Sequence, residues 1–209
     1  MGRIDGRAAS WVLGGGSLAA LAAVLLASST APPARNPLLI TAFEPFGERI
    51  ETNRNASLEV LRQLRARHGN RFEYAVIPAS AAGEARFRAL LASGDYAGVI
   101  ALGEDGRLPG QAVNLEPYAI AAPVSSRLRR TSPSERIGSP FARSAAAATG
   151  LPLRDGIGLY YCNRVYLHAL RWTRPHGRPA VFVHIPIRGD RATHAWQVLA
   201  VAESAERQH

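Results

Sequence analysis

From Asn36 onward, apolar and polar residues alternate in blocks that predict strands and helices in turn. Short apolar runs bounded by glycine, proline or charged residues are typical of buried strands, and apolar side chains recurring every three or four residues indicate amphipathic helices. The expected strands are Leu38–Phe43, Glu73–Pro78, Tyr96–Gly103, a short one within Ala112–Leu115, Gly156–Tyr161 and Ala180–Pro186. The expected helices are Asn55–His68, Ser80–Ser93, Ser139–Ala148, Asn163–Trp172 and Ala192–Glu203.

This alternation favours an α/β fold, with a mostly parallel twisted sheet covered by helices on both faces. The segment that carries it, residues 36–209, has about 170 residues, which is enough for one domain with a substantial core. An apolar fraction of 47% argues against disorder. We therefore expect a single globular domain after residue 35.

The first 35 residues have a different pattern. Arg3 and Arg7 precede a charge-free stretch from Ala8 to Ala34, which contains the apolar run Leu18–Ala27 and small residues after it. This order is typical of a signal peptide, and an uncleaved signal anchor is the alternative. We expect an exported protein, periplasmic or attached to the membrane and facing outward. If the segment is not a signal, the protein is cytoplasmic.

The formal net charge of +9 does not by itself indicate a nucleic-acid partner. All 25 basic residues are arginine, which points to a compositional bias, and they are scattered along the chain. Scattered arginines usually form solvated faces and not a phosphate-binding patch. No nucleic-acid partner is predicted, and the sequence does not indicate an oligomeric state.

Cys162, the only cysteine, lies where an expected strand ends and an expected helix begins. Sites in open α/β sheets form beyond the carboxyl ends of strands, and the N–H groups of a helix start favour a thiolate. His184 lies near the end of the next expected strand, so the two side chains should meet at one sheet edge as a nucleophile and a base. The alternatives are a small buried thiol and a core histidine. No H-E-x-x-H pattern indicates a metal site.

Six segments, taken in order, resemble the type I pyroglutamyl peptidases, also called pyrrolidone-carboxylate peptidases. AFEPFG from Ala42 resembles the family's GFEPFG, and NASLEVLRQL from Asn55 resembles its N-P-S-W helix start. LGEDGR from Leu102 and AVNL from Ala112 resemble LGQAGGR and VAINL. YYCNRVYLHAL and FVHIPI, which contain Cys162 and His184, resemble FVCNHVFYGLL and FIHVPY.

The resemblance implies a cysteine peptidase that removes an N-terminal pyroglutamyl residue from a blocked peptide, without metal or cofactor. Cys162 would be the nucleophile and His184 the base. The positions that would contact the substrate are Phe43 and Phe46 as apolar walls, Asn55 as a polar contact, Arg107 at the oxyanion and Tyr161 beside the nucleophile. Their simpler interpretations are loop packing for the two phenylalanines, a helix cap for Asn55, and an ion pair with a loop carboxylate for Arg107.

The third catalytic group is the point at which the chain departs from the family. The family orients its histidine with the glutamate of a TPERVAINL-like segment, and counting back from Asn114 in AVNL puts Pro109 at that position. Glu104, directly after a strand, is our first candidate for a substitute carboxylate, and Glu116 is another. A solvated loop acid is the alternative for Glu104. Without an orienting acid, the chain could instead be a non-catalytic peptide-binding or cell-envelope protein on the same fold.

Overall fold

The computed structural model describes residues 36–47, 50–51, 54–121 and 135–208. The predicted signal segment, residues 1–35, lies outside the described residues. Within the described part of the chain, no helix is both long and apolar enough to cross a membrane.

The described residues form seven strands, five α-helices and two short 3₁₀ turns. The strands are β1 (Leu38–Phe43), β2 (Glu73–Ile77), β3 (Gly98–Asp105), β4 (Asn114–Leu115), β5 (Tyr118–Ala121), β6 (Glu135–Gly138) and β7 (Ala180–Pro186). The helices are α2 (Ala56–His68), α3 (Ala81–Ser93), α4 (Pro140–Thr149), α5 (Tyr161–Thr173) and α6 (Arg191–Glu206), and the 3₁₀ turns are η2 (Gly69–Arg71) and η4 (Arg174–His176).

A five-stranded sheet with the order β2-β1-β3-β7-β4 runs through the centre of the domain. Strands β2, β1, β3 and β7 are mutually parallel, and β4 joins β7 in the antiparallel sense. Strands β5 and β6 form a separate antiparallel pair. The predicted α/β class and mostly parallel sheet are confirmed.

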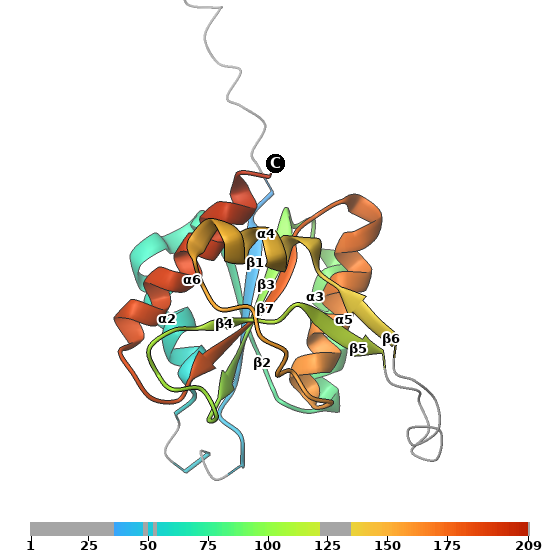
Figure 1. Ribbon diagram of the computed structural model, residues 1–209. Helices are drawn as coiled ribbons and strands as arrows, with labels where there is room; N and C mark the ends of the chain where they lie inside the picture. Colours follow the sequence, from blue (N-terminus) through green and yellow to red (C-terminus); the bar gives the residue numbers. More distant parts are fainter. Residues whose placement is uncertain (1–35, 48–49, 52–53, 122–134, 209) are drawn as a thin grey trace, which may run out of the picture. The chain divides into compact units, whose positions relative to one another are not determined.

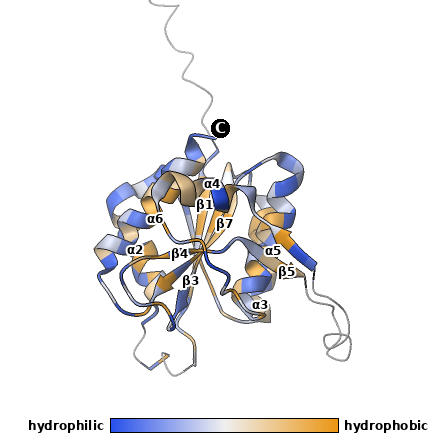
Figure 2. Cartoon of the chain, in the orientation of Figure 1, coloured by the Kyte–Doolittle hydropathy of each residue, from blue (hydrophilic) through white to orange (hydrophobic). Residues whose placement is uncertain are grey.

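Helices cover both faces of this sheet (Figure 1). One apolar cluster joins alternate strand residues such as Ile40, Leu102 and Val183 to α2, α4 and α6. The other cluster joins the remaining set, such as Val99 and Phe182, to α3 and α5. In Figure 2 the central strands are orange, and the helices show blue on their outer sides. Each strand therefore sends successive side chains to opposite layers of the core.

Local sequence signals explain where most helices begin. Asn55, Ser80, Ser139 and Asp190 accept hydrogen bonds from first-turn N–H groups of α2, α3, α4 and α6, and Pro140 opens α4. Helix α5 differs, because its N-cap residue, Tyr160, makes no side-chain cap bond. The helix that carries Cys162 therefore begins without the capping side chain that the other four have.

The expected strand Gly156–Tyr161 is wrong. This stretch is irregular, and it ends in a turn that leads directly into α5. Gly158 has φ +63°, which breaks an extended run, and Leu159 and Tyr160 are 45% and 82% exposed. Cys162 thus follows a loop and not a strand. The hairpin-like pair β5–β6 was not predicted.

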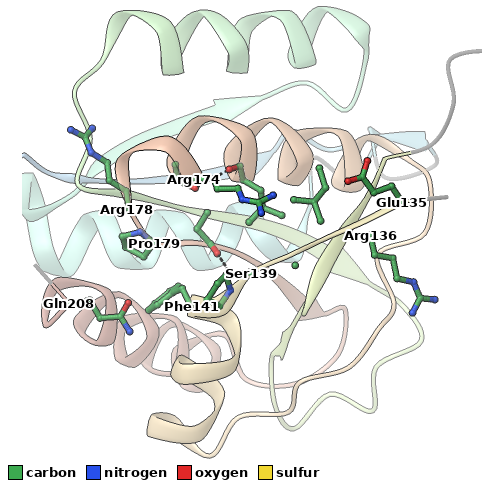
Figure 3. Close-up of a pocket in the computed structure, with 15 residues that line it drawn as sticks. Glu135, Arg136, Ser139, Phe141, Arg174, Arg178, Pro179 and Gln208 are labelled. Carbon is green, nitrogen blue, oxygen red and sulfur yellow. Dashed lines mark hydrogen bonds between the residues drawn. The ribbon is translucent and has the colours of Figure 1, made fainter.

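A cavity of about 410 Å³ lies beside the first residue of β7, Ala180. Its walls come from β6, the start of α4, the end of α5 and Gln208 near the chain end (Figure 3). Cys162 and His184 are not among its lining residues. This cavity is therefore separate from the predicted catalytic pair.

Candidate active site

The sheet brings three chain segments together around His184 near the carboxyl end of β7. In the parallel ladder, Gly103 of β3 is the register partner of His184. In the antiparallel ladder on the other side, Asn114 of β4 is its partner. Paired residues point to the same face of a sheet, so these positions share the face that packs against α5. His184 is only 4% exposed, and its ring lies edge-on against Phe182 at 4.9 Å between centroids.

Cys162 reaches this face from the first turn of α5. Gly103 leaves the space that the thiol uses, because a methyl group at Gly103 would lie 3.2 Å from Cys162 Sγ and 2.6 Å from Cζ of Phe182. Cys162 and His184 therefore lie on neighbouring elements, and both approach Gly103. Within the described residues, no hydrogen bond joins the thiol to the His184 ring.

The thiol is protonated in this resting arrangement. Burial is the main cause that raises the pKa of Cys162 to about 12, and the negative charges of Asp105, Glu116 and Glu104 add to it. A backbone hydrogen bond at Cys162, at the helix start, lowers this pKa as expected, but its effect is smaller than that of burial. Burial and three carboxylates outweigh the effect of one helix end.

A buried carboxylate holds the other side of the histidine. Glu116, which is fully buried, lies with Oε1 2.7 Å from Nδ1 of His184. The partner oxygen Oε2 accepts a hydrogen bond from the backbone N–H of Gly156 at 2.9 Å. This contact requires the Nδ1–H tautomer, since an ionised carboxylate only accepts hydrogen bonds. In the neutral ring, Nε2 of His184 then carries no proton and can accept one.

The backbone of Glu116 is fixed as firmly as its side chain. Its N–H donates to the carbonyl of Phe182 in β7 at 3.0 Å. Its carbonyl accepts the hydroxyl of Tyr166, from α5, at 2.9 Å. Burial is the main cause that raises the pKa of Tyr166 above its usual range, so this hydroxyl is a donor at neutral pH. Glu116 is therefore tied to both the strand of the histidine and the helix of the cysteine.

Our first choice for the orienting acid, Glu104, does not occupy this position. Side chains alternate along β3, so Gly103 and Asp105 face α5, whereas Glu104 faces the opposite layer. There its Oε2 accepts a hydrogen bond from the N–H of Ala56, at the start of α2, at 2.8 Å. The carboxylate at Nδ1 of His184 is Glu116, the second candidate.

Arg107 lies beside this site and contacts Asp105 and Gly156. Its guanidinium pairs with Asp105 at 2.7 Å and donates to the carbonyl of Gly156 at 2.6 Å. Burial acts to raise the pKa of Asp105, but hydrogen bonds from the Arg107 side chain and backbone, together with the charges of His184 and Arg107, hold it below its usual range. The interpretation of Arg107 as the partner of a loop carboxylate is the one that the contacts match.

The other predicted contact residues differ in how accessible they are. Phe43 is buried in the core at 2% exposure, whereas Phe46, in the loop after β1, is 39% exposed. Asn55 caps α2 through Ser57 and Leu58 N–H groups, and its amide also donates to the carbonyl of Glu44. Tyr161 is half-buried, with the guanidinium of Arg164 5.7 Å from its ring centre. Asn55 thus has the contacts of a structural cap, and only Phe46 and Tyr161 offer accessible ring surface.

Asn163, next to the cysteine, was not singled out from the sequence. Its amide makes two hydrogen bonds to one residue of β5, accepting from the N–H of Ile120 at 2.6 Å and donating to its carbonyl at 2.8 Å. The start of α5 is thereby fastened to the strand that follows Glu116.

Comparison with known proteins identifies the family. No protein-family model matches the chain. The pyrrolidone-carboxylate peptidase of Deinococcus radiodurans is 32% identical over 173 residues, and the match covers 71% of this chain and 77% of that protein. The chain belongs to the pyrrolidone-carboxylate peptidase family.

Solved structures of the family share the fold. Pyrrolidone carboxyl peptidase from Thermococcus litoralis superposes with a TM-score of 0.66 at 18% identity, covering 83% of this chain and 96% of that one. Pyroglutamyl peptidase I from Bacillus amyloliquefaciens gives a TM-score of 0.63 at 19% identity, covering 84% and 98%. At these identities the likeness shows the fold alone.

The family motif shows how Glu116 could have been found. In TPERVAINL the glutamate stands three residues before an Ala-Ile pair, and Glu116 stands three residues before Ala119-Ile120. Matching VAINL to AVNL instead puts Pro109 at the position of the glutamate. The contact between Glu116 and His184 favours the later match, so Pro109 is not evidence of a missing acid.

Among the described residues, no group of three or more histidine, cysteine or acidic side chains is arranged to hold a metal ion.

Proposed function

We propose that this protein is a cysteine peptidase that releases an N-terminal pyroglutamyl residue from peptides. The observation that carries the proposal is the contact of Glu116 with Nδ1 of His184, on the sheet face that Cys162 approaches. A nucleophile, a base and an acid that orients the base are the groups that thiol-dependent acyl transfer needs. Family membership supplies the substrate class.

The resting thiol sets how the reaction starts. Because Cys162 is protonated, its proton passes to Nε2 of His184 as sulfur attacks the carbonyl carbon of the pyroglutamyl residue. The tetrahedral oxyanion is stabilised by N–H groups at the start of α5, where no side chain caps them. His184 then gives the proton to the leaving amine, and the acyl-sulfur bond remains.

Hydrolysis of this acyl-enzyme reverses the roles. Nε2 of His184 takes a proton from water, the hydroxide attacks the thioester carbon, and the sulfur leaves as a thiol after regaining the proton. Glu116 keeps the proton on Nδ1 throughout and offsets the positive charge of the imidazolium in both halves.

The ring of pyroglutamate is small and uncharged, and an apolar slot suits it. Besides the exposed Tyr160, the accessible aromatic side chains of the two family motifs that flank this edge are Phe46 and Tyr161. We assign them to the walls of the ring pocket. Phe43 supports the loop from beneath, and Arg107 positions the Gly156 backbone that holds Glu116.

The rival interpretation, a non-catalytic binding protein, was motivated by Pro109. That motivation disappears because Glu116 contacts His184.

Hydrolysis of a fluorogenic pyroglutamyl amide by the reduced full-length chain tests the proposal. We expect Cys162→Ala to abolish turnover, and Glu116→Gln to lower kcat by roughly 10²- to 10⁴-fold through loss of tautomer control. Glu104→Gln is the matched control, because this carboxylate binds the N–H of Ala56 on the opposite layer, and it should retain kcat within about threefold. Turnover that survives Cys162→Ala, or a reduced protein that cleaves no pyroglutamyl amide, would refute the proposal.

A further inference from the structure

Asn114 is a buried polar residue whose hydrogen bonds are one-sided. It is 3% exposed, and it lies in β4 directly opposite His184. Its Nδ2 donates to Oε1 of Glu116 at 3.2 Å and to the carbonyl of Arg154 at 2.9 Å. Both partners are acceptors, so the nitrogen must face them. The amide oxygen of Asn114 is then buried with no partner among the described residues.

This arrangement is unfavourable for stability alone. A buried carbonyl oxygen without a donor carries an uncompensated desolvation penalty, whereas a leucine of similar size would carry none. The two hydrogen bonds of the nitrogen only partly offset that penalty. Stability of the fold therefore does not explain well why residue 114 is an asparagine.

The position of the amide nitrogen suggests a different role. Oε1 of Glu116 receives both Nδ2 of Asn114 and Nδ1 of His184, while Oε2 receives the N–H of Gly156. Because each oxygen of Glu116 has a donor besides His184, the carboxylate cannot rotate away from the imidazole without breaking a charge-assisted hydrogen bond. The plane of the carboxylate, and with it the tautomer of His184, is fixed.

We propose that Asn114 is a positioning residue that acts through Glu116: its amide holds the carboxylate in the orientation that keeps the proton on Nδ1 of His184. The inference rests on the proposed function for its kinetic consequence, because an imidazole with a bare Nε2 is what the Cys162 proton requires. Asn114 touches neither the substrate nor the reacting atoms.

Kinetics of Asn114→Leu in the full-length chain test the role. We expect kcat to fall roughly 10- to 100-fold with KM changed less than about twofold, at a temperature where the variant is fully folded. Gln197→Leu is the control, because it removes a bond to the N–H of Val113, next to Asn114, without touching Glu116. It should leave kcat unchanged.

A double-mutant cycle separates positioning from a general effect on the fold. In a Glu116→Leu background, the further change Asn114→Leu should lower kcat less than twofold, because the residue has lost the group through which it acts. An undiminished kcat in the single variant, an equal fall in both backgrounds, or a loss of activity that tracks a lower melting temperature would overturn the inference.

A measurement without substrate keeps the inference separate from the proposed function. In protein labelled with ¹⁵N at histidine, the wild type should show a protonated Nδ1 at the signal that His184→Gln removes, and Asn114→Leu should populate the Nε2–H tautomer. If the wild type cleaves no pyroglutamyl amide, the proposed function fails, and the ¹⁵N signal of His184 alone then tests the positioning role of Asn114. An unchanged tautomer in Asn114→Leu would then refute the positioning role.

Discussion

The resting state of Cys162 gives a sharp quantitative prediction. Burial and three carboxylates raise the pKa of its thiol from 9.0 to about 12. Three pKa units correspond to about a thousandfold less thiolate at neutral pH than an ordinary cysteine has. Since only the thiolate reacts with iodoacetamide, alkylation of Cys162 in the unliganded protein should be slower than that of a free thiol by about the same factor.

The shape of the pH profile distinguishes this cause from simple shielding of the sulfur. We expect the logarithm of the alkylation rate, followed by intact mass, to rise with unit slope from about pH 7 to about pH 10 without a plateau. Shielding alone would lower the rate but leave an inflection near the ordinary thiol pKa. The same protein unfolded in urea should show that ordinary inflection, which serves as the internal reference.

One substitution tests the electrostatic part. Asp105→Asn removes one of the charges that raise the pKa of Cys162 and should speed alkylation about 3- to 10-fold at neutral pH. Glu203→Gln, on α6 and paired with Arg71, should have no effect. A plateau below about pH 8 with a rate above that of the free thiol would refute the reasoning, because it would mean a resting thiolate paired with a charged His184.

Two further predictions concern packing and pH. Gly103→Ala should lower stability by about 1–3 kcal/mol and kcat by at least tenfold, because its methyl would meet the Phe182 ring at 2.6 Å and Cys162 Sγ at 3.2 Å. Thermal unfolding and turnover check it against Gly138→Ala, whose methyl meets nothing closer than 3.5 Å, and equal behaviour of the two variants would contradict the packing argument. His194 is fully buried, and burial is the main cause that lowers its pKa, so the unfolded chain binds a proton more readily and stability should fall as pH drops below about 6.5. Urea midpoints across that range should fall less steeply in His194→Gln, and identical slopes would show that His194 is not the group responsible.

The sequence predicted the layered core well, because its signals there are local. Strand β1 is apolar except for Thr41, and α2 and α4 begin at side chains that cap them, so the expected bounds and the observed ones agree closely. Strand β7, with His184 near its end, was found in the same way.

The parts that were missed depend on tertiary contacts. The apolar letters of Gly156–Tyr161 resemble a strand, but the positive φ of Gly158 and the solvent exposure of Tyr160 show a loop. Strand β4 has only two residues, and its pairing with β7 is what places Glu116 beside His184. This strand lies within the short one expected at Ala112–Leu115, but its antiparallel pairing with β7 was not predicted. Glu116 was therefore only the second candidate, and the Glu-x-x-Ala-Ile spacing is the sequence signal that favours it. Glu104 lies on the other side of the sheet because side chains alternate along β3.

The side-chain amide of Asn163 makes with Ile120 of β5 the two hydrogen bonds that a neighbouring strand would make. It accepts from the backbone N–H of Ile120 and donates to its carbonyl. Ile120 lies four positions after Glu116, and Asn163 directly follows Cys162. The first turn of α5, with Cys162, and the segment that carries Glu116 are therefore expected to open as one cooperative unit, because loosening either exposes the same buried amide. The two hydrogen bonds between Asn163 and Ile120 therefore hold Cys162 and Glu116 in place together. We expect neither residue to become disordered without the other.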